Sequence, residues 1–364
     1  MIGNSNYLIK RFYMAEKRWK KRPEGSNWGD FGVDDQLGRL NFVTTSKVKQ
    51  GVRRVEEGLS FCLSLPLDLP GGNILNPRRH GPVLRPTLQD DGRPNINFRL
   101  EDEHPSAADV INDDAVIMHL QYSTQWDSLA HVGQLFDAND DGVSEPVFYN
   151  GFRAGVEIIG PTKSEDAGAA GQFQSKTTTK VMALGIENMA LKTIQGKAVM
   201  VDLEKHFNKR RELVGYDKLM KVVQVDQLKI EKGDLVCLHT GFASLILEMN
   251  GSPDKKILDN SCAVLDGRDQ KLLNWITETG LSALIADNYA VEALPATQEE
   301  GKTSFLPLHE HCLFKLGIPL GELWYLTQLA EWLRKNNRSE FLLTAPPLRL
   351  PGAVGSPTTP VATV

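Results

Sequence analysis

A short polar stretch, HLQYSTQWDSLAH, holds residue types that can move protons or bind a metal. If it forms a strand, successive side chains alternate between the two faces, so Gln121, Gln125 and Asp127 point the same way. His119 falls on that face too. Polar groups on one face of a strand that leaves the core need partners, which a ligand, a metal, water or one another can supply. The stretch is therefore a candidate active site.

Asp127 and His131 offer an acid–base pair within this stretch. They are four residues apart, which places both on one side of a helical turn that starts near Asp127. Histidine titrates close to neutral pH and is a frequent general acid or base. The alternative is a structural network in which the polar groups only satisfy one another.

A second polar cluster, LHEHCLFKLGIPLGE, lies near the C-terminus. His309, His311 and Glu322 are its candidate ligands or acid–base groups. Two close histidines and a glutamate beyond a Gly-Pro break suggest a site, but their spacing fits no simple metal signature. Asp287 and Asn288 are a third candidate, because they end an apolar strand, where α/β proteins usually place their sites.

Strands alternating with helices must position these groups, and their alternation predicts an α/β fold. Apolar or alternating runs predict strands, at 59–70, 114–120, 197–204, 233–242, 281–288 and 340–352. Periodic runs between a capping residue and a glycine predict helices, at 46–58 and 269–280, with an interrupted one at 309–336.

Turn and loop signals divide the chain into two predicted parts. Residues 1–60 read as an N-terminal helical and turn-rich arm, with a helix over 1–25, and residues 61–364 as a catalytic domain. Residues 71–113 are long and polar for a plain connection, so we expect them to cover a substrate. Residues 160–180 are small, polar and without period, which predicts a mobile surface loop.

Composition and charge exclude several classes of function. The chain has 364 residues, 41% hydrophobic, and a net charge of −5. No basic stripe dominates, which argues against a nucleic-acid partner. No apolar run approaches the ~20 residues of a membrane span. Four scattered cysteines without a C-x-x-C pair, and no signal peptide, predict a cytoplasmic protein acting on a small molecule.

Taken in order, these segments resemble the cyclase family, the metal-dependent hydrolases that include bacterial kynurenine formamidase and isatin hydrolase. The resemblance rests on NWGDFGVDDQLGRLNFVT, STQWDSLAHV, GDLVCLHTGF, IADNYAVE, LHEHCLFKLGIPLGELW and PLRLPGAVGSP. It implies a swivelling β/α/β fold with a central mixed sheet, and assembly as a homodimer or homotetramer.

The family pattern is H-x-G-T-H-x-D-x-P-x-H, and this chain differs from it at two of the positions that bind metal in the family. In the family the first two histidines and the aspartate bind metal, and the last histidine transfers protons. Here Gln121 and Gln125 stand at the two histidine positions, whereas Asp127 and His131 are kept. The resemblance therefore implies a divergent member of the family.

The family's remaining metal ligands fall on His309 and Glu322, although His311 lies close to His309. An amide oxygen is a harder and weaker ligand than imidazole, so glutamines shift a site from zinc towards manganese, magnesium or no metal. Two alternatives stay open: a divalent ion, manganese or zinc, held by Asp127, His309 and Glu322 with the two glutamines, or no metal.

Each alternative implies its own chemistry. With metal, we expect hydrolysis of a cyclic or aryl amide, lactone or ester by metal-activated water, with His131 moving the proton to the leaving group. Without metal, His131 and Asp127 suit a lyase, isomerase or cyclase acting on a carbonyl compound. A non-catalytic binding protein is a third reading.

Several further residues are candidates for binding substrate. Gln121, Gln125 and His119 would supply hydrogen bonds to a carbonyl or would orient water. Trp126, with Trp28 and Phe31 as weaker candidates, would line an aromatic pocket. Large aromatic side chains also pack well in any core, which is the alternative for all three. The predicted site therefore comprises His119, Gln121, Gln125, Trp126, Asp127, His131, His309 and Glu322.

Overall fold

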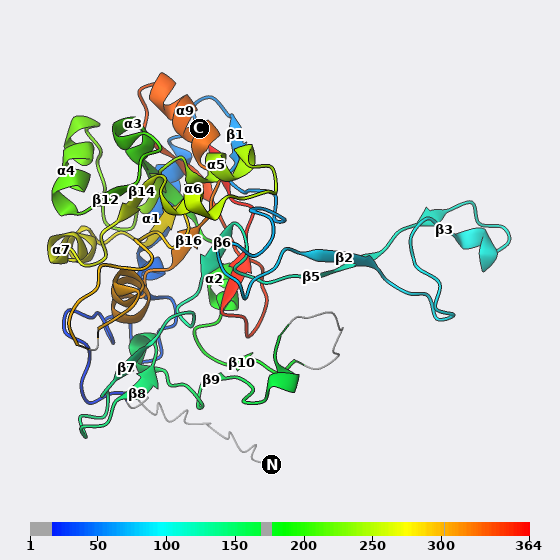
Figure 1. The fold of residues 1–364 in the computed structure, drawn as a ribbon, viewed down its shortest axis with the longest axis horizontal. Coiled ribbons are helices and arrows are strands. Elements are labelled where there is room, and N and C mark those ends of the chain that lie inside the picture. Colours follow the sequence, from blue (N-terminus) through cyan, green and yellow to red (C-terminus); the bar gives the residue numbers. More distant parts are fainter. Residues whose placement is uncertain (1–16, 169–176, 302) are drawn as a thin grey trace, which may run out of the picture.

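The computed structural model describes residues 17–168, 177–301 and 303–364. At its centre is a nine-stranded sheet, whose strands in sheet order are β1 (Ser60–Cys62), β19 (Val361–Thr363), β17 (Glu340–Thr344), β11 (Gln195–Asp202), β13 (Leu235–His239), β15 (Ala283–Ala286), β16 (Leu320–Glu322), β6 (Gln125–Asp127) and β18 (Gly355–Pro357). The strands from β11 to β16 are parallel and their neighbours on both sides antiparallel. This confirms the predicted mixed sheet (Figure 1).

Side chains of the central strands point alternately into two separate cores. In β13, Val236 and Leu238 join one apolar cluster, whereas Leu235 and Cys237 join the other. Buried parallel strands are apolar on both faces because helices cover both. The first core includes α4 (Tyr216–Val225), α7 (Gln270–Thr279), α8 (Pro307–His309) and the π-helical segment η5 (Glu310–Leu316); the second includes α2 (Ile186–Lys192) and α9 (Thr327–Lys335).

Helix α7 shows how local sequence sets an element's bounds. Asp269 precedes it and accepts hydrogen bonds from the backbone amides of Lys271 and Leu272. Gly280 follows it with a φ of 67°, the left-handed conformation that ends many helices. Leu272 and Ile276, one turn apart, are buried. The predicted helix at 269–280 is confirmed.

Smaller elements surround this body. They comprise η1 (Gly38–Phe42), α1 (Thr45–Val52), η3 (Tyr149–Gly151), η4 (Ser164–Asp166), α3 (Leu203–Phe207), α5 (Phe242–Glu248), α6 (Lys255–Asp259) and the strand pairs β7 (Gln134–Phe136) with β8 (Glu145–Val147), β9 (Ile158–Ile159) with β10 (Lys180–Val181), and β12 (Glu212–Val214) with β14 (Ala263–Leu265). None of the described helices is long and apolar enough to cross a bilayer.

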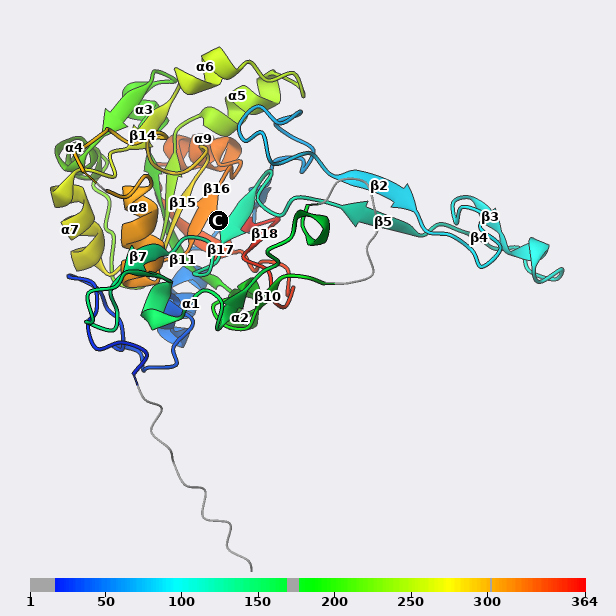
Figure 2. The ribbon, with the colours of Figure 1, turned by 60° about the horizontal axis from the view of Figure 1, so that its bottom comes forward.

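Residues 83–117 form an arm that leaves the body (Figures 1 and 2). Its stem is the antiparallel pair of β2 (Val83–Pro86) and β5 (Asp114–Ile117); farther out are β3 (Phe98–Arg99), η2 (Leu100–Asp102) and β4 (Val110–Ile111). The expectation that residues 71–113 cover a substrate stays a prediction, although strand pairing draws most of the segment into a ribbon that points away from the body (Figure 1).

Three expectations about connecting segments have different outcomes. Residues 17–25 contain no helix, so the helix expected over 1–25 is wrong there; residues 1–16 lie outside the described part. The mobility expected of 160–180 stays a prediction, since 169–176 also lie outside it. The boundary near residue 60 stays a prediction too, although Leu40 and Val43 pack in the same core as the sheet.

Candidate active site

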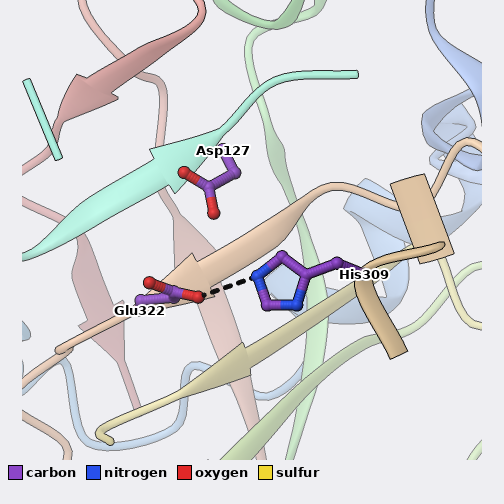
Figure 3. A group of neighbouring side chains, drawn as sticks. All are labelled: Asp127, His309 and Glu322. Carbon is purple, nitrogen blue, oxygen red and sulfur yellow. Dashed lines mark ion pairs between the residues drawn. The ribbon is translucent and has the colours of Figure 1, made fainter. Parts of the chain in front are cut away.

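Two adjacent strands and one helix bring the candidate site together. β6 and β16 are antiparallel, with Gln125 opposite Glu322. His309 ends α8, and its Nε2 lies 3.3 Å from a Glu322 carboxylate oxygen. Ligand atoms of Asp127, His309 and Glu322 lie within 4.8 Å of one another, and all three residues are buried (Figure 3). Groups almost 200 residues apart thus meet at one edge of the parallel strands.

Glu292 fixes the orientation of the His309 ring. Its carboxylate lies 2.8 Å from His309 Nδ1 and also accepts the backbone amides of Leu308 and His309, each at 3.0 Å. The other ring nitrogen is thereby directed towards Glu322. Metal-binding histidines characteristically have such a carboxylate on the second nitrogen. Sequence reasoning missed Glu292, although the residue ends the IADNYAVE segment; its place just beyond a buried strand is the only local signal.

The charges of the cluster control its protonation. Burial, followed by the charge of Glu322, raises the pKa of Asp127 to about 8. Burial opposes protonation of His309, but its hydrogen bonds with Glu292 and Glu322 outweigh this effect and raise its pKa to about 10. Burial also acts to raise the pKa of Glu322. The hydrogen bond with His309 and the positive charge of that ring outweigh burial, so the pKa of Glu322 is lowered.

His131 is the neutral base beside this cluster. Its Nε2 lies 3.8 Å from Asp127 Oδ1, and a fifth of its side chain is exposed. Burial, then the positive charges of His309 and Arg79, lower its pKa to about 4. At neutral pH the imidazole is therefore unprotonated and can accept a proton. A tight turn, in which the His131 amide donates to the Ser128 carbonyl at 3.0 Å, replaces the expected helical turn.

Two buried oxygens of the cluster have no hydrogen-bond partner: Asp127 Oδ2 and Gln125 Oε1. An unsatisfied buried polar atom costs about 1–3 kcal/mol. The Gln125 amide nitrogen contacts Asp127 Oδ1 at 3.3 Å and Glu322 Oε2 at 3.1 Å. Two carboxylates, one imidazole and one amide oxygen form a donor set that suits a hard or borderline divalent ion. The residues present therefore fit a divalent metal.

The strand expected to run through the opening stretch is interrupted, which separates His119 from the cluster. Turns fill the space between β5 and β6. His119 is half-buried and lies two residues beyond the end of β5, where its ring is 5.4 Å from that of His80. Gln121 lies in the turns, and its side chain packs against Gly355. A Cβ added to Gly355 would lie 2.5 Å from the side-chain amide nitrogen of Gln121. The prediction of one continuous strand is wrong because the chain turns before Gln125.

Two of the three candidate pocket aromatics, Trp126 and Trp28, pack in the core, whereas Phe31 is half-buried. Trp126 alternates with Gln125 and Asp127 along β6 and points to the opposite face, where its indole N–H donates to the Ala345 carbonyl at 2.8 Å. Its ring packs edge-on against Trp324 at 5.0 Å. Trp28 is equally buried. A role in binding substrate stays a prediction for Trp126, and this packing does not favour it.

Three remaining polar candidates contact structural groups. His311 Nε2 lies 2.9 Å from the Thr277 hydroxyl, on the side of α7, so His309 alone of the two histidines joins the cluster. Asp287 accepts the backbone amides of Thr240 and Gly241 at 2.8 Å each and fixes the turn before α5. The third, Asn288, donates to the Ala263 carbonyl at 2.9 Å, although its own buried side-chain oxygen has no partner among the described residues.

A second group of Asp202, Glu204 and His239 also has the composition of a metal site. Its cation is supplied by the chain itself, because Arg334 Nη2 lies 2.8 Å from Asp202 and 2.9 Å from Glu204. His239 Nδ1 lies 2.9 Å from Asp202, and its side chain is fully buried. We interpret this group as a structural ion network.

The His239 network is expected to make stability depend on pH. Burial lowers the pKa of His239, but Asp202 and Asp287 outweigh it and raise that pKa above 6.5. The stabilisation is therefore complete below 6.5 and is lost as the pH rises through the folded-state pKa. In urea denaturation, His239→Gln is expected to lower the free energy of unfolding by about 1.5–3 kcal/mol at about pH 6, where His239 is charged. The loss should be smaller at about pH 9. Equal losses at both would contradict the prediction.

Comparisons with known proteins agree with the observed fold. Residues 63–293 match the family model described as putative cyclase. The crystal structure of a novel cyclase is 28% identical, has a TM-score of 0.69, and aligns over 93% of this chain and 97% of that chain. Isatin hydrolase A from Labrenzia aggregata, bound to benzyl benzoate, is 13% identical with a TM-score of 0.50, over 84% and 93%. The second likeness concerns the fold alone. No curated protein matches the chain.

Proposed function

The chain belongs to the cyclase family, and on that premise we propose that it hydrolyses a cyclic or aryl amide, lactone or ester of a small molecule. The observation that carries this proposal is the buried cluster of Asp127, His309 and Glu322 with the neutral His131 at its edge. Proton-accepting and anionic groups that converge on one point are what hydrolysis of an acyl bond requires.

Asp127, His309 and Glu322 would hold a divalent metal, with Gln125 Oε1 as a further ligand. Such an ion, when bound, polarises a carbonyl and lowers the pKa of a bound water. Manganese suits two carboxylates and an amide, and zinc is the alternative. Whether Gln121 is also a ligand stays a prediction.

The chain's own residues would handle the protons. His131 is unprotonated at neutral pH, so it accepts a proton as water adds to the carbonyl and returns it to the leaving nitrogen or oxygen. Glu292 keeps His309 from rotating away from Glu322. The side-chain amide nitrogen of Gln125 donates to Asp127 and Glu322 and so fixes the position of one carboxylate relative to the other.

A metal-independent lyase, isomerase or cyclase is the second candidate, and one observation favours it. The Gln125 amide nitrogen already contacts both carboxylates. With a pKa of about 8, Asp127 would also be largely protonated at neutral pH. A carboxylic acid beside a neutral imidazole is suited to moving protons on a carbonyl compound.

Metal analysis followed by turnover assays tests these alternatives. Protein purified without chelator should contain about one divalent ion per chain, and added manganese or zinc should stimulate hydrolysis of a panel of lactones, aryl amides and aryl esters. Absence of both metal and stimulation would overturn the metal-dependent reaction. Proton exchange on a carbonyl compound without hydrolysis would favour the second candidate.

Glu292→Gln is expected to weaken metal binding by about 10- to 100-fold, because orienting partners of metal-binding histidines contribute that much. The amide is nearly isosteric but loses the negative charge beside Nδ1. Calorimetric titration with manganese measures the change. Glu300→Gln makes the same chemical change at an exposed position and should leave affinity unaltered. Equal affinities for all three proteins would show that Glu292 does not support a metal site.

We also propose that the chain forms a homodimer or homotetramer through its arm. Leu84 and Val116 are directly opposed in the β2–β5 ribbon, yet they are 69% and 45% exposed. Two-stranded ribbons are marginally stable unless another surface packs on them. A second copy of the chain would supply that surface. The cytoplasmic location expected from the sequence stays a prediction.

Leu84→Asp is expected to dissociate this assembly, because a charge replaces an apolar side chain in the proposed contact. Light scattering after size-exclusion chromatography would show a monomer. Arg85→Ser alters the neighbouring residue, which points to the other face of the strand, and should keep the assembly. A monomeric wild type, or an unchanged mass for Leu84→Asp, would contradict the proposal.

A further inference from the structure

Arg79 is a cation next to the candidate site that has no ion-pair partner among the described residues. It lies between the cis peptide at Pro70 and the start of the arm. Its Nη1 donates to the Gln121 carbonyl at 2.7 Å, and the side chain is half-buried. A guanidinium carries five N–H donors in a planar fork, so most of this fork is unused by the protein.

Arg79 lines a small hollow next to the turns that precede β6. Gln121, Tyr122, Asn76 and Tyr289 are among its other lining residues. The cavity has a volume of about 10 Å³, which holds roughly one water-sized group. It therefore has room for one oxygen of a carboxylate, while the rest of the ligand lies outside the hollow.

Three other polar side chains of the hollow, those of Tyr122, Asn76 and Tyr289, already contact protein groups. The Tyr122 hydroxyl donates to the Gly72 carbonyl at 2.8 Å and accepts the Gly71 amide at 3.1 Å. The Asn76 amide nitrogen contacts the Tyr289 hydroxyl at 3.4 Å. Among Arg79, Tyr122, Asn76 and Tyr289, Arg79 is thus the one charged donor, and it has N–H groups left for a ligand.

Charge in the neighbourhood also favours an anion at this point. The positive charge of Arg79 lies close enough to favour a lower pKa at Asp127, His131 and Glu322, although burial and Glu322 keep the pKa of Asp127 raised. Asp127 and Glu322 repel an anionic ligand unless a cation offsets them. A guanidinium fork pairs with a carboxylate through two parallel hydrogen bonds.

We propose that Arg79 binds a carboxylate of the substrate, remote from the bond that is broken, and that the enzyme thereby selects acidic amides, lactones or esters. This rests on the proposed hydrolase function. Arg79 is a specificity residue in this scheme. It acts in the ground state and the transition state alike, so its loss raises KM and leaves kcat little changed.

Two aryl esters that differ in charge test the proposal: neutral 4-nitrophenyl acetate and anionic mono-4-nitrophenyl succinate. Arg79→Gln is expected to raise KM for the anionic ester by about 10- to 100-fold, the value of a charge-assisted hydrogen bond, and to leave the neutral ester unaffected. Arg78→Gln changes the adjacent, exposed arginine and should alter neither. An equal fall in kcat for both esters would overturn the proposal, because Arg79 would then act on the reacting carbonyl.

Binding gives a readout that does not depend on turnover. If wild type hydrolyses neither ester, the hydrolase function fails for these esters, and titration calorimetry with benzoate and benzamide still tests Arg79. Benzoate should bind to wild type and to Arg78→Gln with equal affinity, and about 10- to 100-fold more weakly to Arg79→Gln. Benzamide, which is neutral, should bind to all three proteins with the same affinity. Circular dichroism establishes that each variant is folded. Equal benzoate binding by all three proteins, or none by wild type, overturns the inference.

Discussion

Replacing His131 with alanine is expected to lower kcat by about 10²- to 10⁴-fold, the contribution of a positioned general acid–base group. His131 is a neutral imidazole 3.8 Å from the Asp127 carboxylate, beside the point where ligand atoms of the cluster converge. Steady-state hydrolysis of the best ester or amide in the panel measures the effect. Alanine is accommodated because the side chain is partly exposed.

The pH profile of the wild type sharpens this prediction. Burial and the charges of His309 and Arg79 lower the pKa of His131 to about 4, and a bound cation acts in the same direction. His131 therefore stays unprotonated throughout the range in which an ordinary histidine titrates. Loss of activity attributable to its protonation is expected only well below a pH of 6.5.

His119→Ala is the matched control for His131→Ala. It removes the same side chain from the same stretch, but at a part-exposed position that contacts His80 and lies outside the cluster. We expect its kcat to be unchanged. Full activity in His131→Ala, or equal losses in both variants, would remove His131 from the proposed mechanism.

Local patterns were sufficient for much of the fold. The cap at Asp269 and the stop at Gly280 act within a few residues, and they placed α7 correctly. Continuous apolar runs placed β13 and β15 for the same reason. In contrast, the sequence after Ile117 suits a continuous strand, but the chain turns there. The residues before the turn pair with β2 in the arm, and the residues after it pair with β16 in the central sheet. Such pairing depends on distant segments.

The site was predictable only where the resemblance supplied it. Spacing alone did not distinguish His309 from His311; the opposite faces that these two residues present, towards Glu322 and Thr277, depend on how the helix packs. Glu292 and Arg79 come to the cluster from separate segments and match no short pattern. Tertiary contacts gather these groups, and a single sequence does not reveal such contacts.

Gln125→His is expected to shift the site towards zinc, raising zinc affinity by more than about 100-fold, since loss of an orienting partner alone changes affinity 10- to 100-fold. Gln125 faces Glu322 across the β6–β16 pair, and its amide oxygen is buried without a partner. An imidazole there would replace a weak neutral oxygen by a nitrogen that zinc prefers, and manganese would gain less. Competition with a chelator of known affinity measures both ions.

Two further variants separate a direct ligand from a general effect of added histidine. Gln298→His places an imidazole on the surface and should leave both affinities unchanged. Gln121→His tests the other divergent position, whose side chain packs against Gly355 in the turns before β6. Because that position lacks a direct contact with Glu322, we expect a smaller gain than at 125. Equal zinc affinity in wild type and Gln125→His would show that this side chain lies outside the ligand sphere, and the two glutamines would then favour proton-transfer chemistry without metal.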